Sequence, residues 1–438
     1  GRFDQYIYPF YKKDIEAGNI TRDDAIELMG LFFVKLNSLN KVRPWGHTKY
    51  GAGYPLYQNL TVGGMKANGN DGTNELSYIC IEAMDIVRLP QPNFSARYWR
   101  ETPKEFLEAS AKLIRKGFGM PAMYVDETII KSLQYIGIDE VVARDYAPMG
   151  CVEVIIPGKW GHRATGMSYM NFAKMLLILL NNGVDPDTGI QIMSINGREG
   201  KEVEFETYED LYKGWEKVLK FYSDLAVESD YICDKSLKKY DIDPFASCLT
   251  DNCIERGKIL KEGGAEYDFI SNSPVGINTV ADSLSAIKKL VYDDKIISLE
   301  EYKEAIDSNW EGKKGQYIRN LALKAPKFGN DDDYADNISK DLFNSYLKLL
   351  PEYKNERYGK GPFGCGYTMS TSNISSNVPY GMEVGATPDG RYAREPLNEG
   401  ASPTNMAGKE GPTGIIKSMS KLPNDKITGG QLLNEEIA

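Results

Sequence analysis

The spacing of apolar residues along the chain predicts helices that alternate with short strands. Four helical patterns begin at a Thr or Ser that stands three positions before an acidic residue, which is the arrangement of an N-terminal capping box. These predicted helix starts are Thr21 to Asp24, Thr102 to Glu105, Thr207 to Asp210 and Ser298 to Glu301. A nearly all-apolar segment, Asn171 to Asn182, predicts a buried helix that ends at Gly183.

Short apolar or alternating runs between the helical segments predict β-strands. The candidates are Tyr57 to Val62, Cys151 to Ile156 and Gly414 to Ile416. Strands that alternate with helices favour an α/β fold. The chain has 438 residues, 42% of them hydrophobic, which is enough to bury a large core in one barrel or in two or three smaller domains.

Net charge, the length of apolar runs and cysteine content indicate which partners and which cell compartment to expect. A formal net charge of −10 disfavours nucleic-acid binding, which needs a concentrated basic face. The longest wholly apolar run, Met175 to Leu180, is too short to span a bilayer. Six cysteines without a regular framework are typical of a reducing compartment. We therefore expect a soluble, cytoplasmic protein that binds neither nucleic acid nor membrane.

Two clusters of possible metal ligands lack the spacing of known metal sites. Cys248 and Cys253 form a C-x4-C pair, but the chain has only two histidines and no second pair nearby, so zinc is not predicted. The acidic cluster at 331–333 and Asp336 lacks the alternating spacing and the closing Glu of a calcium loop. We interpret it as a turn that caps the next helix, and we predict no metal site.

The segment Gly150-Cys-Val-Glu153 carries the most chemical information. In an extended backbone, residues two positions apart point the same way and lie about 6.5–7 Å apart. Cys151 and Glu153 would then present a thiol and a carboxylate to one small molecule, as a hydrogen-atom acceptor beside a base. The same triplet is also typical of a buried structural cysteine next to a surface glutamate.

Further motifs favour the chemical interpretation. Gly150 to Glu153, followed by Pro157-Gly-Lys159, resembles the cysteine loop of the glycyl radical enzymes, the superfamily of pyruvate formate-lyase, glycerol dehydratase and choline trimethylamine-lyase. Other stretches resemble the same family in the same order along the whole chain: Gly1 to Gln5, Asn74 to Tyr78, Cys253 to Lys258, Gly263 to Tyr267, Ala281 to Ile287, Pro326 to Asp336, Asn377 to Gly381, Gly385 to Arg391 and Gly400 to Pro403.

The resemblance implies a ten-stranded α/β barrel of two five-stranded halves, incomplete in this chain. Family members carry the radical on a glycine in an Arg-Val-x-Gly-Tyr segment near their C-terminus, and no such segment occurs in these residues. Relatives also have a helical part before the motif that starts at Gly1. We therefore expect residues 1–438 to form a single barrel domain that lacks the N-terminal helical part and the C-terminal glycyl radical domain, and to be inactive alone.

The resemblance also implies a chemistry. A thiyl radical on Cys151 would abstract hydrogen from a small polar substrate, and Glu153 would act as general base while water or another heteroatom group leaves. Burial of the loop should raise the pKa of Glu153 toward the working range. The expected partners are a radical S-adenosylmethionine activase with an iron–sulfur cluster, which installs the glycyl radical, and a second copy in a homodimer. No other bound cofactor is expected.

The sequence leaves open which substrate of this family the protein would use. Gly150 replaces the second cysteine of pyruvate formate-lyase, and Tyr169 stands where that enzyme's carboxylate-binding arginine would fall, so a formate C-acetyltransferase is disfavoured. Thr165-Gly166 replaces the His-Asp pair of the diol dehydratases. The pattern at Thr165 and Tyr169 resembles the branch of hydroxyproline dehydratase and isethionate sulfite-lyase. The alternatives are an arylacetate decarboxylase, a formate C-acetyltransferase-type member although it is disfavoured, and a non-catalytic or split relative that binds a partner.

Candidate substrate-binding residues, besides Thr165, lie in three segments. His162 and Arg163 share the cysteine loop and suit an anionic group of the substrate. His47 precedes a glycine-rich turn that relatives bring to the substrate, and Asn377 and Tyr380 lie in a segment that relatives bring near the radical site. Each also has a structural interpretation, as an ion pair, a packed loop end or a backbone contact.

Overall fold

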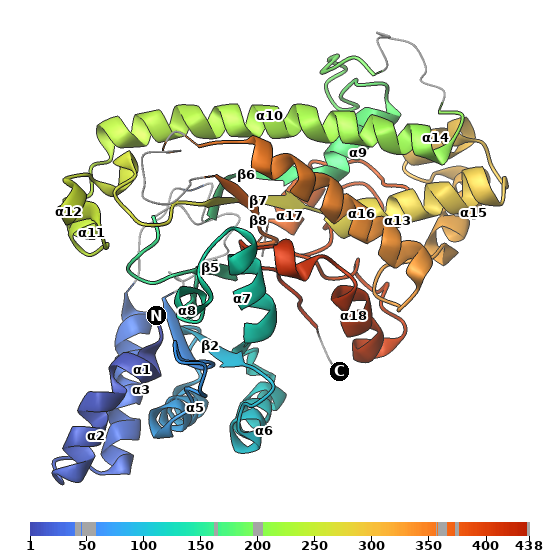
Figure 1. The fold of residues 1–438 in the computed structure, drawn as a ribbon. Coiled ribbons are helices and arrows are strands. Elements are labelled where there is room, and N and C mark those ends of the chain that lie inside the picture. The colour runs from blue at the N-terminus through green and yellow to red at the C-terminus, as the bar shows by residue number, and fades with distance from the viewer. Residues whose placement is uncertain are drawn as a thin grey trace.

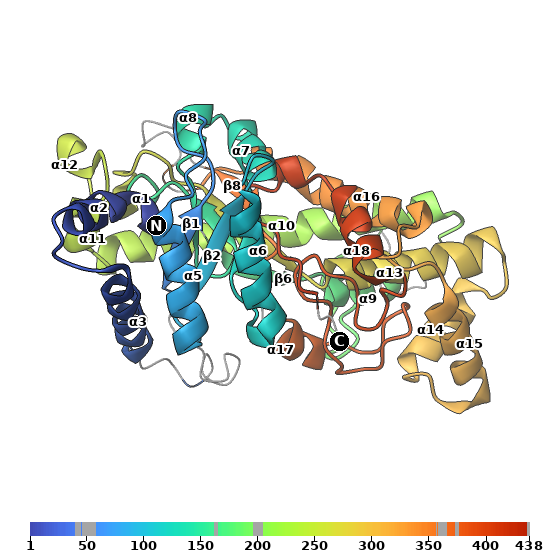
Figure 2. The same ribbon diagram turned by 90° about the horizontal axis from the view of Figure 1, so that it is seen from below.

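The computed structural model describes residues 1–39, 45, 58–161, 165–195, 205–355, 357, 366–372 and 376–435, without the side chains of 165–167. Helices cover the outside of two small parallel sheets, and a β-hairpin lies between the sheets (Figures 1 and 2). The long helix α10 (Tyr208–Tyr240) runs along the top of the molecule in Figure 1.

The first sheet is formed by three parallel strands in chain order, β1 (Asn59–Gly63), β2 (Asn93–Tyr98) and β3 (Ala122–Val125). Almost every residue of β1 and β2 is buried, as expected for strands covered on both faces. The helices of this region are α1 (Phe3–Tyr6), α2 (Tyr8–Glu16), α3 (Arg22–Ser38), α5 (Glu75–Val87), α6 (Lys104–Leu113) with η1 (Ile114–Phe118), α7 (Asp126–Tyr135) and α8 (Glu140–Ala143).

The second sheet is also parallel and contains β6 (Thr165–Asn171), β7 (Ile270–Val275) and β8 (Tyr367–Met369). All six residues of β7 are buried because it is the central strand under helices. The remaining elements are α9 (Phe172–Leu180), α11 (Pro244–Cys248), α12 (Cys253–Arg256), η2 (Leu260–Glu262), α13 (Ile277–Ile287), η3 (Lys288–Asp293), α14 (Leu299–Asp307), α15 (Gly312–Lys324), α16 (Asp333–Leu349), η4 (Leu350–Glu352), α17 (Asn377–Met382), α18 (Gly411–Ser420) and η5 (Asn424–Lys426).

The hairpin between the sheets consists of β4 (Ala147–Met149) and β5 (Glu153–Ile155). Met149 pairs with Glu153, so residues 150–152 form a three-residue turn. The first turn residue, Gly150, has a φ of 66°, a conformation that glycine adopts without strain. The hairpin has a hydrophobic cluster of its own, which includes Tyr124, Tyr146, Val154, Ile156 and Trp160. Its base is therefore firmly packed.

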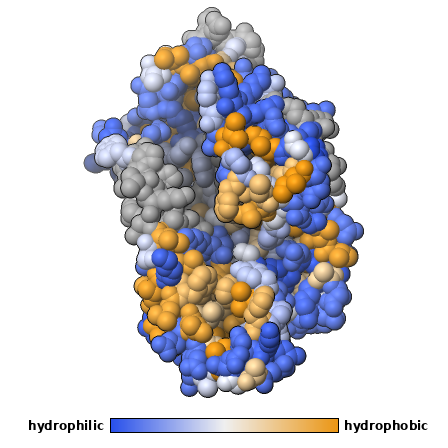
Figure 3. All heavy atoms as spheres, turned by 90° about the vertical axis from the view of Figure 1, so that its left-hand side faces the viewer, coloured by the Kyte–Doolittle hydropathy of each residue, from blue (hydrophilic) through white to orange (hydrophobic). Residues whose placement is uncertain are grey.

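Apolar side chains also reach the surface near the N-terminus. Helix α3 buries Ala25 and Phe33, but it leaves the side chains of Leu28, Leu31 and Val34 about half exposed. Figure 3 shows hydrophobic areas, separated by hydrophilic residues, on the side of the molecule that lies to the left in Figure 1. Within the described residues, no helix combines the length and the apolar composition needed to cross a bilayer.

Most predicted helix starts are confirmed. Thr21 and Ser298 form complete capping boxes with Asp24 and Glu301, and the Thr207 hydroxyl accepts a hydrogen bond from the amide of Asp210. The buried helix predicted at 171–182 is α9, and Asn171 caps it. In the acidic cluster, Asp332 caps α16, as the interpretation of a helix-capping turn expects.

Three local predictions are wrong. Gly414 to Ile416 belong to helix α18, because Gly414 and Ser418, one turn apart, are its buried face and Ser418 hydrogen-bonds Asp336 of α16. Thr102 does not cap α6; its hydroxyl accepts from the amide of Trp99, and Pro103 precedes the helix. The predicted strand at 151–156 is shorter, because the hairpin turn takes Cys151 and Val152.

Candidate active site

Cys151 lies at the tip of the β4–β5 hairpin and is partly exposed. The backbone at this position is a turn and not a strand, so the thiol and the carboxylate do not stand side by side along an extended chain. Glu153 instead turns back under the tip. Its Oε2 accepts hydrogen bonds from the backbone amides of Cys151 at 2.8 Å and Val152 at 3.1 Å. Only 1% of Glu153 is exposed.

The position of the Glu153 carboxylate explains Gly150. A Cβ atom at residue 150 would lie 2.6 Å from Glu153 Oε2, far inside van der Waals contact. Any larger residue would displace the carboxylate in addition to adopting an unfavourable φ. The glycine before Cys151 therefore belongs to the geometry that brings the acid under the thiol.

Burial raises the pKa of both groups. Desolvation, followed by the nearby Glu153, raises the pKa of Cys151 to about 12. Desolvation also raises the pKa of Glu153, although the Ser372 hydroxyl and the turn amides favour its charged form and oppose the shift. The predicted direction for Glu153 is thus confirmed. At neutral pH Cys151 is a thiol and not the thiolate that nucleophilic cysteine chemistry uses.

Side chains of the second sheet reach the thiol and the carboxylate. Ser372, which follows β8 and is 4% exposed, has its hydroxyl near both groups, where it opposes the rise that burial causes in the pKa of each. Tyr169 of β6 is 37% exposed, yet desolvation and the charges of Glu153 and Cys151 raise the pKa of its phenol. The hydroxyl of Tyr380 in α17 donates to the carbonyl of Tyr169 at 3.2 Å. These residues form one polar group around the hairpin tip.

Side chains of the first sheet hold the backbone of the tip. Asn59 of β1 and Asn93 of β2 each donate a side-chain hydrogen bond to the carbonyl of Gly150, both at 3.0 Å. The hydroxyl of Tyr124 in β3 donates to the carbonyl of Cys151 at 3.0 Å. One side chain from each strand therefore contacts the tip, and we call Asn59, Asn93 and Tyr124 the tip contacts.

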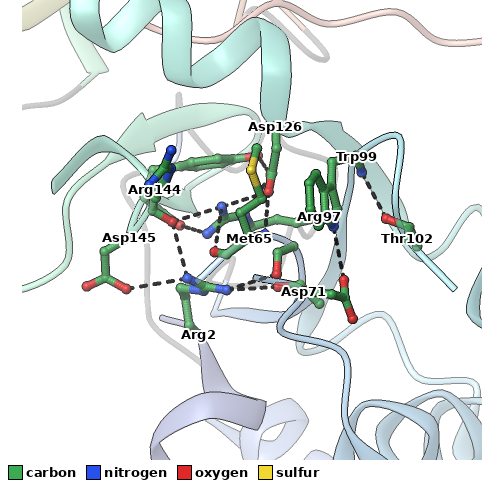
Figure 4. Close-up of polar contacts among 12 residues, drawn as sticks. Arg2, Met65, Asp71, Arg97, Trp99, Thr102, Asp126, Arg144 and Asp145 are labelled. Carbon is green, nitrogen blue, oxygen red and sulfur yellow. Dashed lines mark hydrogen bonds and ion pairs between the residues drawn. The ribbon is translucent and has the colours of Figure 1, made fainter. Parts of the chain in front are cut away.

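A buried ion pair holds the base of the hairpin (Figure 4). Arg97 of β2 donates to both carboxylate oxygens of Asp126, at 2.8 and 3.0 Å, and neither side chain is exposed. The same guanidinium donates to the carbonyls of Tyr146 at 2.8 Å and Arg144 at 2.9 Å, just before β4. Tyr146 returns a hydrogen bond to Asp126 at 2.8 Å, and its ring centre lies 3.9 Å from Arg97 Cζ.

The N-terminal motif completes this base. Arg2 donates to the carbonyl of Arg144 at 3.2 Å and to that of Gly63 at 3.1 Å. Its proximity to Asp145 and Arg144 is visible in Figure 4. A Cβ at Gly64 would lie 2.6 Å from Arg97, so only glycine leaves room for the guanidinium there. We call Arg97, Asp126 and Tyr146 the base contacts.

On the opposite side, a glycine pair separates the hairpin from the second sheet. A Cβ at Gly430 would lie 2.0 Å from the carbonyl oxygen of Val152, and one at Gly429 would lie 2.4 Å from Cβ of Ser271 in β7. Gly429 also donates to the carbonyl of Met369 at 2.8 Å, at the end of β8. The backbone at 429–430 thus fills the narrow space between hairpin and sheet.

The structure places the predicted site residues unequally. Cys151 and Glu153 lie together, and Tyr380 lies against Tyr169, beside them. Asn377 contacts a different segment: its side chain donates to the carbonyl of Leu397 at 3.2 Å. The backbone of Thr165 opens β6 opposite Ser271, while its side chain is not described. His47, His162 and Arg163 lie outside the described residues.

Several residues of the site were not identified from the sequence. They are Ser372, Asn59, Asn93, Tyr124 and Arg97, and each reaches the hairpin from a distant part of the chain. A polar residue at the first position of two neighbouring strands was the available signal for Asn59 and Asn93, because the parallel register places them opposite each other.

Comparison with known proteins identifies the family. A family model described as pyruvate formate lyase-like matches residues 1–381. The chain belongs to the pyruvate formate-lyase-like family. This finding confirms the predicted membership in the glycyl radical enzymes. The chain is 40% identical over 442 aligned residues to the probable dehydratase YbiW from Escherichia coli, covering 100% of this chain and 54% of that protein. It is 38% identical to trans-4-hydroxy-L-proline dehydratase from Clostridioides difficile, with the same coverage.

Solved structures of the family share the fold. The glycerol-bound, B12-independent glycerol dehydratase from Clostridium butyricum has a TM-score of 0.91 at 38% identity, over 98% of this chain and 52% of that chain. The substrate-bound hydroxyproline dehydratase from Clostridioides difficile has a TM-score of 0.89 at 36% identity, over 98% and 53%. The predicted α/β barrel type of the glycyl radical enzymes is therefore confirmed. The chain spans about half the length of the curated relatives it matches.

Proposed function

We propose that this chain forms the substrate-activating part of a glycyl radical lyase of the dehydratase type. The observation that carries the proposal is the placement of a neutral thiol, Cys151, at a hairpin tip directly above a buried carboxyl, Glu153. Because the pKa of Cys151 is about 12, the sulfur keeps its hydrogen at neutral pH. An S–H bond is what hydrogen-atom transfer requires.

The same thiol, Cys151, is the group that would give a hydrogen atom to the glycyl radical of this family. A glycyl radical on a segment outside these 438 residues, installed by a radical S-adenosylmethionine activase, would supply the acceptor that converts the Cys151 thiol to a thiyl radical. Cys151 then takes a hydrogen atom from a substrate carbon that bears a hydroxyl group. The C–H bond breaks, an S–H bond forms, and the unpaired electron stays on that carbon.

Glu153 completes the elimination. Its carboxylate takes the hydroxyl proton of the substrate radical, which makes the departure of the neighbouring group easier. The leaving group departs with its bonding electron pair and receives the proton from Glu153, so water or another H–X molecule is released. The product radical takes the hydrogen back from Cys151. The sum is a carbonyl product and H–X, and both residues return to their starting states.

The surroundings of the thiol support elimination over acetyl transfer. A two-cysteine mechanism needs a second thiol before Cys151, and any side chain at Gly150 would collide with Glu153 Oε2. Tyr169 supplies a neutral phenol where an arginine would bind a carboxylate. The more similar relatives are named dehydratases, at 38–40% identity, whereas the decarboxylase 4-hydroxyphenylacetate decarboxylase is 30% identical.

The experiment is a substrate panel on the enzyme that carries this chain and the glycyl radical segment of its relatives, activated without oxygen. The probes are glycerol, propane-1,2-diol and (2S)-3-sulfopropanediol, with 4-hydroxyphenylacetate as the decarboxylation probe. We expect a dehydrated product from at least one of the first three and no decarboxylation of the last. Decarboxylation without dehydration would overturn the proposal.

A further inference from the structure

Each strand of the first sheet contributes at least one polar side chain to the cysteine hairpin, although the sheet itself contains no part of the hairpin. The tip contacts, Asn59, Asn93 and Tyr124, end on the carbonyls of Gly150 and Cys151. The base contact Arg97 ends on the carbonyls of Arg144 and Tyr146. All of these bonds run from a side chain to hairpin backbone, so they fix position without adding a charge next to the thiol.

Apart from close packing against the backbone at 429–430, the tip backbone has few other contacts that fix its position. Turn residues 150–152 lie beyond the last ladder pair of the hairpin, Met149 with Glu153. Within the turn, the Cys151 and Val152 amides are bonded to Glu153, which belongs to the hairpin itself. Bonds of that kind shape the turn but do not anchor it to the rest of the protein. The anchoring polar contacts described for the tip backbone come from the first sheet.

The base is built for rigidity. Arg97 and Asp126 are fully buried and bonded in bidentate fashion, and both lie at the ends of the first sheet, on β2 and at the start of α7. Asp126 Oδ2 also accepts from the amide of Met65 at 2.6 Å. A charged pair with all of these partners has one low-energy arrangement, because moving either group leaves a buried charge unpaired. The carbonyls before β4 are therefore held at fixed points.

We propose that the tip and base contacts are positioning residues, which set the place of the Cys151 sulfur relative to the substrate and to Glu153. The proposal rests on the proposed function for its catalytic consequence, but its structural content does not depend on it. Hydrogen-atom transfer needs the two atoms in close contact, and a misplacement of about 1 Å can cost about 10²-fold in rate. Loosening the tip should therefore slow the reaction without weakening substrate binding.

The central variant is Tyr124→Phe, which removes one hydrogen bond to the Cys151 carbonyl and keeps the ring in its hydrophobic cluster. The matched control is Tyr302→Phe. Tyr302 is also buried and donates to a backbone carbonyl, that of Pro388, far from the hairpin in the sequence. Tyr146→Phe tests the base in the same way, because it removes the bond to Asp126 and leaves the ring against Arg97.

The first readout is hydrogen–deuterium exchange of peptides that cover residues 147–156, measured by mass spectrometry on the enzyme described above. Loss of a typical hydrogen bond should speed exchange there by about 5- to 10-fold in Tyr124→Phe and by less in Tyr146→Phe. Tyr302→Phe should leave this peptide unchanged. Hairpin exchange equal to wild type in both hairpin variants would overturn the proposal, whatever happens to their thermal stability.

The second readout is the split between kcat and KM, with whichever probe substrate turns over. We expect kcat of Tyr124→Phe to fall about 10-fold with KM within about twofold, because the sulfur is displaced while the substrate contacts stay. A normal kcat in a variant with a loosened hairpin would contradict the catalytic part of the proposal. If no probe turns over, the exchange data still decide the structural part, and only the proposed function fails.

Discussion

The two parallel sheets differ in which part of the cysteine hairpin they contact. The first sheet sends Asn59, Asn93, Tyr124 and Arg97 to backbone carbonyls of the hairpin. The second sheet is separated from the hairpin backbone by the glycine pair at 429–430. Tyr169 of β6 and Ser372, which follows β8, lie near the thiol and the carboxyl themselves.

We interpret this difference as two separate roles for the two sheets, positioning of the hairpin and control of its ionisation. Asn59, Asn93 and Tyr124 are neutral and bond only to carbonyl oxygens, so they place the tip without adding a charge beside its thiol and carboxyl. Hydroxyl groups near a thiol and a carboxyl change how easily each loses a proton, as the opposing effects of burial and Ser372 on the pKa of Glu153 illustrate. On the proposals above, the first sheet would set the position of the hairpin and the second sheet the ionisation of its side chains.

Glu153→Gln separates chemistry from position and should have the largest effect among these tests. The amide oxygen of Gln can still accept from the Cys151 and Val152 amides, so the hairpin should keep its shape. We expect turnover to fall by about 10²–10⁴-fold because general-base help is lost. Transfer of hydrogen from substrate to Cys151 should persist, measured as loss of deuterium from a substrate labelled at the hydroxyl-bearing carbon.

Near-normal turnover by Glu153→Gln would remove the base from this mechanism. It would leave the hairpin as a positioning device for some other radical reaction.

Gly430→Ala tests the packing between the hairpin and the second sheet. The new Cβ would meet the Val152 carbonyl, and the φ of 92° disfavours a side chain. We expect a loss of about 3–5 kcal/mol in the free energy of unfolding, measured by denaturant titration. Gly158→Ala is the matched control. It has a φ of 76° and nothing within 4 Å of its Cβ, so it should lose only about 1–2 kcal/mol.

Equal losses in the two alanine variants would show that the close approach at 430 carries no packing cost. The separation between the hairpin and the second sheet would then be wider than described.

Ser372→Ala should have the smallest effect, and its direction is the informative part. The hydroxyl favours the charged form of Glu153, so its removal should raise the pKa of that carboxyl further. A general base works when deprotonated, so activity appears as the pH rises through this pKa. We therefore expect the acidic limb of the pH profile of kcat/KM to move to higher pH. A shift to lower pH, or no shift, would contradict the role given to the second sheet.

The sequence predicted those parts of the molecule that local interactions determine. Helix starts at Thr21 and Ser298 depend on contacts three residues away, and the order of family motifs predicted the barrel. The strand predicted at 414–416 is wrong because a short apolar run fits both a strand and a helix. The packing of this segment against α16 decides for the helix.

The sequence predicted Cys151 and Glu153, which are close together in the chain, and the family resemblance added Tyr380, which lies against Tyr169. Cys151 and Glu153 were identified together, but the turn that folds Glu153 under the tip depends on Gly150 and was not. Asn59 and Tyr124 contact the hairpin across 91 and 27 residues of sequence. No local sequence pattern indicates these contacts, because Asn59 and Tyr124 reach the hairpin only when the strands of the folded sheet are in register.

The central claim is that Cys151 is the hydrogen-atom acceptor. It is tested most directly by Cys151→Ser in the activated enzyme, with the glycyl radical quantified by electron paramagnetic resonance and product measured on the same sample. Serine is close in size, but its O–H bond is too strong for efficient hydrogen transfer. The account predicts a full radical signal and no detectable product. Product formation by the serine variant at a rate near that of the wild type would contradict it.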